Sequence, residues 1–438
     1  MLTQALIHFP TFLRTYTLLK ESQWWSKEQL EEYQLLQLKK LLNHAYENVP
    51  YYTKIFKKLK LKPKEIQSID DLQKLPYLTK EIVRKNLDTL KATNYPEHKF
   101  QFFSTGGSTG QPLRFYIDKA VWSSQLAAYG KILMDLTGRS YFDRCVLIVR
   151  SEIPFEYRSF RRTLVLSSFF INDKYLPLFI KKIRKLKPKY FLSYPSAITN
   201  LAVYMKRNNL EVFPSVKIIM CHAETLYEWQ RDLLEEMFQC RVYNRYGLRE
   251  TAALGSTCEH SNYLHMFPEY GIVELIGKEG KPVKKEGEVG EIVGTGFHTY
   301  IFPFIRYKTG DLGVYTTKKC PCGRNYPLLK RIEGRVQEFV VSKTKQLIPL
   351  IGVYGLVAMC SPNVKECQLY QDTEGEIILN IVKTQKYSNA DSQTIKKNFQ
   401  KRFGTEFKLT ICQVDQIPRT KRGKHRFLIQ KLPIEFTY

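Results

Sequence analysis

The sequence predicts an α/β fold with a large N-terminal part and a small α+β part at its C-terminal end. Between residues 113 and 244, short apolar runs with β character alternate with helical runs, a pattern typical of layered α/β domains. Residues 271–315 form short β segments separated by glycine and charged turns, which indicates a small β subdomain. After Arg335 the pattern changes to strands around one helix, as in a separate domain of about a hundred residues. We therefore predict two domains, 1–335 and 336–438.

Single elements follow from periodicity and from residues that begin or end helices. Apolar residues recur at helical spacing between residues 27 and 60, and Pro50 interrupts this run because proline lacks the amide proton of a helix interior. Thr79 is the expected N-cap of a further helix, since its hydroxyl can accept from the first turn. Further helices are expected at 122–136, 176–186, 196–208, 227–238 and 391–403. Strands are expected at 113–117, 145–149, 190–193, 217–221, 241–244, 367–370, 376–382 and 410–414.

The composition is that of a folded protein with a strong positive charge. Among 438 residues, 68 Lys and Arg stand against 42 Asp and Glu, a formal charge of +26. Such a charge attracts polyanions, including nucleotides, CoA, anionic glycans and the inner leaflet of a membrane, although a solvated basic surface explains it equally well. No nucleic-acid-binding module is found, so no nucleic-acid partner is expected. Nine cysteines without a secretion signal or a membrane-spanning run predict a cytoplasmic protein, with peripheral contact at the inner membrane face as an option.

Five short motifs carry the chemistry. The first is S-T-G-G-S-T-G-Q-P at 104–112, whose hydroxyls and backbone amides suit phosphate oxygens because glycine permits close approach. By itself this run is more often a Gly/Ser turn between two strands than a phosphate loop. The other four follow downstream as Y-G-L-R-E (246–250), Y-K-T-G-D (307–311), E-G-R (333–335) and P-R-T-K-R-G-K (418–424).

In this order the five motifs resemble those of the adenylate-forming ligases, and most closely the phenylacetate–CoA ligase and CapK-like branch. The segments H-A-Y-E-N-V-P-Y-Y (44–52) and L-P-Y-L-T-K-E (75–81) resemble the N-terminal signature of that branch, and we interpret them as scaffold. The resemblance extends from about residue 33 to 432. It implies a large adenylate-forming domain that binds ATP and an acid, followed by a small mobile domain with a catalytic lysine.

The resemblance also implies the cofactors ATP and Mg²⁺ and assigns residues to them. The residues expected at ATP or AMP are Ser104, Thr105, Gly106, Gly107, Ser108, Thr109, Gly110, Ala223, Glu224, Tyr246, Gly247, Asp311 and Arg335.

Catalytic roles are implied for three residues among or beside these. Glu250 is expected to bind Mg²⁺ as a hard oxygen ligand, and Lys424 to neutralise the adenylation transition state. Arg335 is expected to contact ribose or phosphate. The binding residue Asp311 is expected to accept hydrogen bonds from both ribose hydroxyls. Without the flanking motifs, Asp311 would be an ordinary β-turn residue and Lys424 part of a solvated tail.

A cysteine and histidine pattern predicts a structural metal site. Cys320 and Cys322 lie one residue apart, and Cys258 and His265 follow the Y-G-L-R-E motif. Three thiolates and one imidazole are the ligand set of a closed tetrahedral Zn²⁺ site, and zinc at corresponding places in this ligase branch supports it. His260 is the rival imidazole.

The acid pocket and the domain junction are less well defined. Tyr194, Tyr243 and Tyr246 would give an aromatic acid pocket, but they are equally suited to the core. Arg249 stands where the family has a hydroxyl residue, and Thr251 is a candidate to supply that hydroxyl. Gln337 takes the hinge position, which is Asp in the family.

These observations lead to an AMP-forming ligase that activates an aryl, hydroxy or amino acid as an acyl-adenylate. The loop 341–349 lacks the glycine that helps to form the CoA tunnel in the family, so we favour a sugar amine or hydroxyl in capsule or O-antigen biosynthesis as acceptor. The alternatives are an acyl- or aryl-CoA synthetase with CoA as acceptor, and a degenerate scaffold protein in a glycan-assembly complex.

Overall fold

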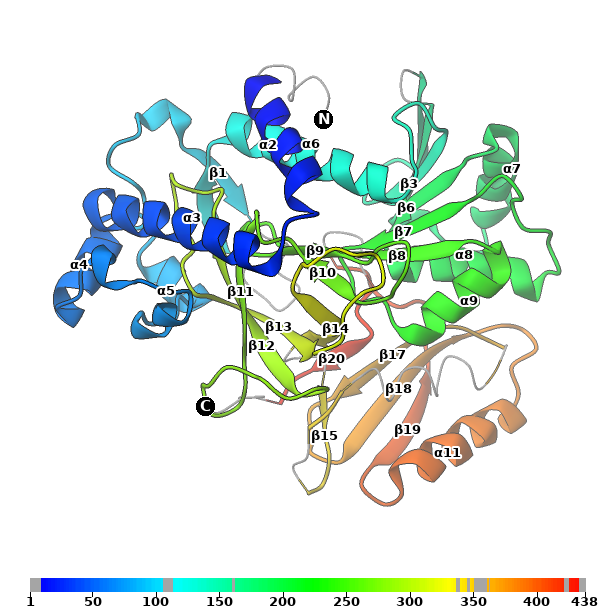
Figure 1. Ribbon diagram of the computed structural model, residues 1–438. Helices are drawn as coiled ribbons and strands as arrows, with labels where there is room; N and C mark the ends of the chain where they lie inside the picture. The colour runs from blue at the N-terminus through cyan, green and yellow to red at the C-terminus, as the bar shows by residue number, and fades with distance from the viewer. Residues whose placement is uncertain are drawn as a thin grey trace. The chain divides into compact units, whose positions relative to one another are not determined.

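The computed structural model of the protein describes residues 9–104, 113–159, 162–335, 339–344, 347–349, 361, 363–420 and 425–432. The chain forms two compact units. Unit 1 contains Met1–Ser140 and Arg245–Arg331, and unit 2 contains Tyr141–Asn244 and Ile332–Thr437. The predicted α/β class is confirmed (Figure 1). The predicted domain boundary after residue 335 stays a prediction, since the segment from Ile332 groups with Tyr141–Asn244 in one unit.

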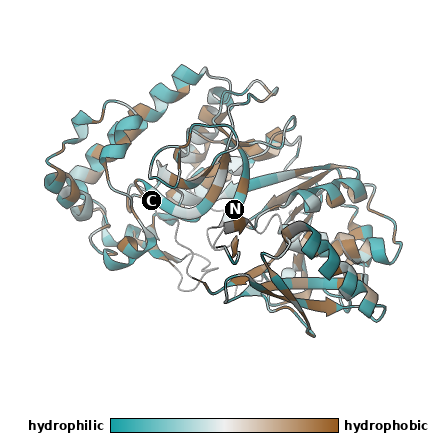
Figure 2. Cartoon of the chain, turned by 90° about the horizontal axis from the view of Figure 1, so that it is seen from below, coloured by the Kyte–Doolittle hydropathy of each residue, from teal (hydrophilic) through white to brown (hydrophobic). Residues whose placement is uncertain are grey.

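Unit 1 begins with helices that pack around its core. The principal ones are α2 (Phe9–Ser22), α3 (Lys27–Asn48), α4 (Pro50–Leu59), α5 (Lys80–Lys85) and α6 (Lys119–Leu136). Figure 2 shows both hydrophobic and hydrophilic residues along the helices, as expected of helices with one face in a core. Pro50 occupies the first turn of α4 after a break at Val49, so the chain stays helical on both sides of the interruption. Thr79 accepts a hydrogen bond from the Ile82 amide at 3.2 Å, which confirms the predicted cap.

The strands of unit 1 pair in antiparallel fashion. A hairpin joins β1 (Gln101–Ser104) to β2 (Arg114–Ile117), with Ser104 paired to Arg114 at the end where the two strands are connected. The other strands follow the order β11, β12, β13, β14, β10, β9, β8. Their bounds are β8 (Arg241–Gly247), β9 (Leu254–Ser256), β10 (Leu264–Met266), β11 (Gly271–Ile276), β12 (Val289–Gly296), β13 (Tyr307–Tyr315) and β14 (Leu328–Arg335). β8 begins in unit 2 and β14 ends there.

Unit 2 has a sheet in the order β8, β7, β6, β3, β5, β4. The strands β7, β6, β3 and β5 run parallel to one another, and the edge strand β4 runs antiparallel to β5. Its strands are β3 (Cys145–Val149), β4 (Phe155–Arg158), β5 (Thr163–Ser167), β6 (Tyr190–Ser193) and β7 (Ile218–His222). The helices between them are α7 (Leu176–Leu186), α8 (Pro195–Arg207) and α9 (Glu228–Phe238). Their apolar side chains form one buried cluster with the strands.

The C-terminal part of unit 2 is a four-stranded sheet with one helix. The strand order is β19, β18, β17, β20; the inner strands β17 and β18 are antiparallel, and each outer strand is parallel to its inner neighbour. Its elements are β17 (Val364–Gln371), β18 (Glu376–Lys383), α11 (Asn389–Phe403), β19 (Lys408–Gln413) and β20 (Leu428–Gln430), next to the small pair β15 (Phe339–Val341) and β16 (Leu347–Pro349). Ile395, Phe399 and Phe403 of α11 pack with Leu369 and Leu379 in one apolar cluster.

A buried arginine ties the segment that precedes α5 to the start of β13. Arg306, only 3% exposed, donates through Nε and Nη2 to the Glu274 carboxylate at 3.1 and 2.8 Å, and through Nη1 to the Leu75 carbonyl at 2.7 Å. The Leu78 amide donates to the Arg306 carbonyl at 2.9 Å, and the Lys308 amide donates back to the Leu78 carbonyl at 2.9 Å. The 75–81 segment, interpreted as scaffold, therefore runs beside the strand that carries the Y-K-T-G-D motif.

Substitution of Arg306→Ala should lower the free energy of unfolding by about 3–5 kcal/mol, because it leaves the nearly buried Glu274 carboxylate without its cation. Urea unfolding monitored by intrinsic fluorescence measures this loss. Lys281→Ala is the matched control: it breaks the ion pair with Glu279, both of whose side chains are 80% exposed, and should change stability by less than about 1 kcal/mol. Equal losses in the two variants would contradict the role given to Arg306.

Candidate active site and cysteine cluster

Two tyrosine–carboxylate hydrogen bonds join the Y-G-L-R-E and Y-K-T-G-D motifs. The Tyr246 hydroxyl at the end of β8 donates to Asp311 Oδ2 at 2.9 Å. The Tyr307 hydroxyl on β13 donates to Glu250 Oε1, also at 2.9 Å. Both carboxylate residues are 5% exposed, so their few polar contacts determine how they are oriented. The two motifs thus form one structural group in unit 1, with each motif supplying one tyrosine and one acid.

The local chain explains this arrangement. Residues 307, 309 and 311 point to one face of β13 because side chains alternate along a strand, and all three are buried. Thr309 Oγ1 fixes this face: it donates to the Ile292 carbonyl at 2.8 Å and accepts from the Asp311 amide at 3.0 Å. Tyr307 received no role in the sequence analysis. The sequence does contain a signal for Tyr307: it lies four residues before Asp311 on a strand, so the two side chains are expected on the same face.

Glu250 lies in a tight turn between β8 and β9. The Thr251 amide donates to the Leu248 carbonyl at 3.3 Å, and Thr251 adopts a φ of +56°, a left-handed conformation that reverses the chain. The Thr251 hydroxyl donates to the Glu250 carbonyl at 2.7 Å and its side chain is buried. Thr251 therefore stabilises the turn, and this contact gives no support to its use as a substitute hydroxyl toward substrate.

Arg249 contacts the base of the Ser/Thr/Gly loop. Its Nη1 donates to the Ser104 carbonyl at 3.2 Å, and its guanidinium carbon lies 4.8 Å from the centre of the Phe103 ring, within cation–π range. Ser104 is the last residue of β1 and the first of the loop. Where the family has a hydroxyl residue, this chain therefore has a cation that holds the entrance to the loop.

Ala223 and Glu224, the residues predicted to lie beside adenine, follow the end of β7 in unit 2. Glu224 Oε2 accepts from the Ser196 amide at 3.1 Å, in the first turn of α8, where a carboxylate satisfies a free amide. Ala223 has a φ of +66°, which turns the chain after the strand. The His222 ring lies 5.4 Å from that of Tyr194. Ala223 and Glu224 thus form a compact turn, and their contact with adenine stays a prediction.

The predicted acid-pocket residues of unit 2 are buried in different clusters. Tyr194, 8% exposed, packs with the residues under α7 and α8, whereas Tyr243, 6% exposed, packs with Cys145, Tyr190 and Met220. Both have the burial of core residues, and their contact with the acid stays a prediction.

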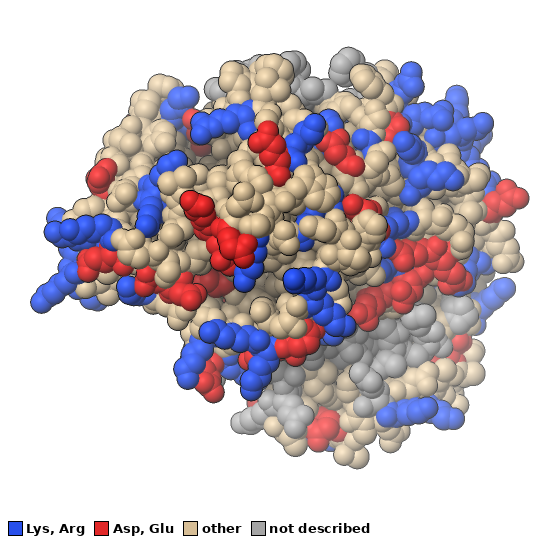
Figure 3. All heavy atoms as spheres, in the orientation of Figure 1, with Lys and Arg blue, Asp and Glu red and all other residues tan. Residues whose placement is uncertain are grey.

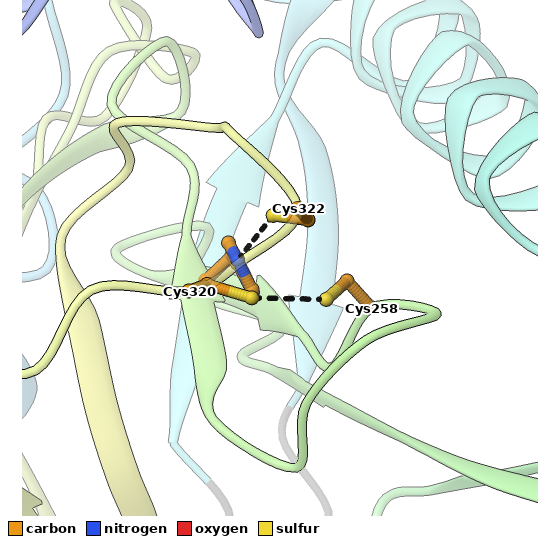
Figure 4. A group of neighbouring side chains, drawn as sticks. Cys258, Cys320 and Cys322 are labelled. Atoms are coloured by element: carbon orange, nitrogen blue, oxygen red, sulfur yellow. Dashed lines mark hydrogen bonds between the residues drawn. The ribbon is translucent and has the colours of Figure 1, made fainter.

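Three cysteines and one histidine from separate segments of unit 1 come together as predicted (Figure 4). The ligand atoms of Cys258, His265, Cys320 and Cys322 all lie within 4.8 Å of one another. The Cys258 and Cys320 sulfurs are 3.4 Å apart, far longer than a disulfide bond of about 2.05 Å, and Cys322 Sγ is 3.3 Å from His265 Nε2. His260, the rival imidazole, is exposed and contributes its backbone amide to Cys258 at 3.3 Å.

The surroundings of the cluster favour thiolate at one of its cysteines. Burial tends to raise the pKa of Cys258, but hydrogen bonds with His265 and the His260 amide lower it to about 6. Burial raises the pKa of Cys320. Because the thiolate is the form that binds metals, the lowered pKa of Cys258 favours metal binding at this sulfur.

Comparison with known proteins gives concordant matches over nearly the whole chain. A family model described as the CapK C-terminal domain matches residues 340–431. Protein CapK of Staphylococcus aureus is 28% identical over 416 residues, which are 92% of this chain and 90% of that protein. Phenylacetate-coenzyme A ligase of Thermus thermophilus is 23% identical over 437 residues, covering 91% and 96% of the two chains.

The fold matches as well. A solved structure of 2-hydroxyisobutyryl-CoA ligase in the postadenylation state has a TM-score of 0.76 at 19% identity, covering 94% of this chain and 93% of that one. These relatives and the fold support the resemblance to the adenylate-forming ligases, in their phenylacetate–CoA ligase and CapK-like branch. The relatives and structural neighbours support the expected class, an AMP-forming ligase that uses ATP.

Several residues that the family resemblance assigns lie outside the described part of this ligase. They are Thr105, Gly106, Gly107, Ser108, Thr109 and Gly110 of the loop, Gln337 of the junction, and Lys424. Arg335 ends β14, but its side chain is not among those described. Their roles, and that of Gly247 at the end of β8, remain predictions.

The contact of Arg249 with Ser104 predicts a specific kinetic defect in this ligase. Arg249→Ala should raise the KM for ATP by about fivefold to tenfold, with a smaller change in kcat, because one hydrogen bond and one cation–π contact that fix the loop are lost. ATP–pyrophosphate exchange at varied ATP measures both constants. Arg84→Ala, which removes an exposed arginine of α5, should leave them unchanged. A drop in kcat alone would contradict a role in holding the loop.

Proposed function

We propose that this ligase activates a carboxylic acid as an acyl-adenylate and transfers the acyl group to a sugar amine or hydroxyl. The observation that carries the proposal is the pair of buried carboxylates, Glu250 and Asp311, each held by one tyrosine hydroxyl. A neutral phenol orients a carboxylate without adding a positive charge, so both acids stay available as acceptors. Aryl, hydroxy and amino acids are the proposed substrate classes.

The first half-reaction makes demands that these residues meet. A substrate carboxylate oxygen attacks the α-phosphorus of ATP, a new P–O bond forms, and pyrophosphate leaves with the electron pair of the broken bond. Asp311 would accept the ribose hydroxyls and so fix the position of the α-phosphate. Lys424 and Arg335 are the proposed cations for the negative charge that builds up, and Arg249 holds the loop that would bind the outer phosphates.

Glu250 fits a magnesium ion. Its Oε1 accepts from Tyr307, and its Oε2 has no hydrogen-bond partner among the described residues. A nearly buried carboxylate oxygen in this state suits a hard divalent cation. Bound there, Mg²⁺ would supply positive charge toward the phosphates of ATP.

The acceptor is the finer part of the proposal. The glycan acceptor rests on the resemblance to CapK-like proteins; the match to CapK extends over 92% of the chain at 28% identity, and the CapK C-terminal family model covers 340–431. The absence of glycine from 341–349 points the same way, because the family uses glycine there for the CoA tunnel. The alternative is CoA, favoured by the phenylacetate-coenzyme A ligases among the relatives. With either acceptor, we propose that residues 336–438 form a separate domain that moves about a hinge at Gln337.

We further propose Zn²⁺ as the resident ion of the cysteine cluster. Three sulfurs and one imidazole nitrogen within 4.8 Å of one another are the ligand number and chemistry of a structural tetrahedral site. Arg324, next to the cluster in sequence, donates to Gln23 Oε1 and pairs with Glu259, both at 3.0 Å. The ion would therefore stabilise the loop that anchors the segment between α2 and α3.

ATP–pyrophosphate exchange with pools of aryl, hydroxy, short-chain and amino acids tests adenylation. Exchange with one pool is expected, and Lys424→Ala should reduce it by at least about a hundredfold while ATP binding measured by calorimetry persists. Lys408→Ala is the matched control, since it removes an exposed lysine of the same C-terminal part. Normal exchange in the Lys424 variant would remove the role of this lysine, and absent ATP binding in the wild type would end the ligase proposal.

A second assay tests the acceptor. Acyl transfer from the identified acid is measured with CoA and with amino sugars, and the substrate that receives the acyl group decides between the two acceptors.

Metal analysis tests the zinc assignment separately. The purified protein should contain one equivalent of zinc, and Cys320→Ser should lose it and lower the Tm by several degrees, because metal binding contributes directly to folding. Cys412→Ser, on β19 and outside the cluster, should keep the metal and the Tm. A wild-type protein that remains zinc-free after refolding with zinc would show that the cluster is a set of reduced thiols.

A further inference from the structure

One side of α7 presents a basic stripe to solvent. The helix buries Leu176, Phe179, Ile180 and Ile183. Residues 178, 181, 182 and 185 follow the i, i+3, i+4, i+7 spacing of one helix face. They are Leu178, which is 39% exposed, and three lysines, of which Lys181 and Lys185 are exposed and Lys182 is half-buried.

The edge strand β4 extends this stripe. Lys182 Nζ lies 3.7 Å from the centre of the Phe155 ring, so the lysine side of α7 and one face of β4 are adjacent. Tyr157 is two residues further along β4 and points to the same face as Phe155. Tyr157 is 53% exposed, as is Ile153 just before the strand. β4 pairs only with β5, so this edge of the sheet is open among the described residues.

Positive charge gathers on this part of the chain. Residues 141–189 contain twelve Lys and Arg against four Asp and Glu. Each acid is already in an ion pair, namely Asp143–Lys189, Glu152–Arg150, Glu156–Arg158 and Asp173 with Arg207 and Lys365. Lys181, Lys182, Lys185 and Lys187 have no carboxylate partner in the described part of the chain. Figure 3 shows blue side chains gathered over the region in which Figure 1 places α7.

We propose that this basic–aromatic face, formed by Ile153, Tyr157, Leu178, Lys181 and Lys185, binds the surface of a membrane that contains anionic phospholipids. A soluble polyanion would be held by the lysines alone and would leave the apolar side chains in water. A lipid headgroup region accepts both, because lysine binds the phosphates while tyrosine and aliphatic side chains enter the interface. None of the helices in the described ranges has the length and apolar composition of a membrane span, so the binding would occur at the surface.

Vesicle co-sedimentation of the purified full-length protein tests the face. Binding is expected to vesicles of phosphatidylcholine with phosphatidylglycerol and not to phosphatidylcholine alone. The double variant Lys181→Gln/Lys185→Gln should bind the anionic vesicles roughly thirtyfold more weakly, since each lysine near such a surface contributes about fivefold. Lys57→Gln/Lys58→Gln on α4 removes the same charge from unit 1 and should bind within about twofold of wild type.

The apolar component is tested by Ile153→Ser/Tyr157→Ser, which leaves every charge in place. This variant should bind the anionic vesicles about tenfold more weakly than wild type at both low and high salt, because salt screens only the electrostatic part of the binding. Thermal unfolding of each variant confirms an intact fold. Equal losses in the α4 and α7 variants would show a general charge effect and overturn the proposal. So would complete displacement by soluble polyphosphate together with no effect of the serine variant, which would indicate a soluble polyanion instead.

Discussion

The candidate active site in unit 1 depends on the hydrogen bonds between two tyrosines and two buried carboxylates. Tyr246 lies at the end of β8 and Glu250 in the turn that follows it, whereas Tyr307 and Asp311 lie on β13. Because each segment gives one donor and one acceptor to the other, neither acid can move without breaking a hydrogen bond from the opposite segment. The turn and the strand are far apart in sequence, so this reciprocal pairing fixes the distance between the proposed magnesium and ribose ligands.

The choice of tyrosine as donor matters physically. An arginine or lysine beside each acid would form a charged pair and compete with Mg²⁺ for Glu250. A phenol supplies one hydrogen bond to one carboxylate oxygen and leaves the net charge of the group negative. The cations proposed for catalysis can then lie on other segments, as Arg335 and Lys424 do, and contribute when the reacting phosphate requires them. Buried Arg306, by contrast, is already committed to Glu274, in keeping with a structural role.

Local signals in the sequence predicted much of this structure, and contacts between distant segments account for what was missed. Thr79 was found as a cap because its effect reaches three residues, and Cys258, His265, Cys320 and Cys322 because metal ligands have few alternatives in a reduced protein. The antiparallel pair of β4 and β5 was missed, because the four residues of β4 are too few to establish a periodicity. The strand β20 was missed because three residues carry no periodicity.

Tyr307 shows why the sequence predicts the candidate site only in part. The sequence identified Asp311 through its motif, but the partner of Glu250 lies 57 residues away and is recognised only when β13 comes next to the turn. The 75–81 segment explains how that strand is held in place. Leu78 pairs in parallel with Tyr307, and Lys80 Nζ donates to the Thr309 carbonyl at 2.9 Å. The 75–81 segment, which has no proposed chemical role, therefore positions the part of β13 that carries the candidate site residues. Scaffold and candidate site are therefore one hydrogen-bonded arrangement.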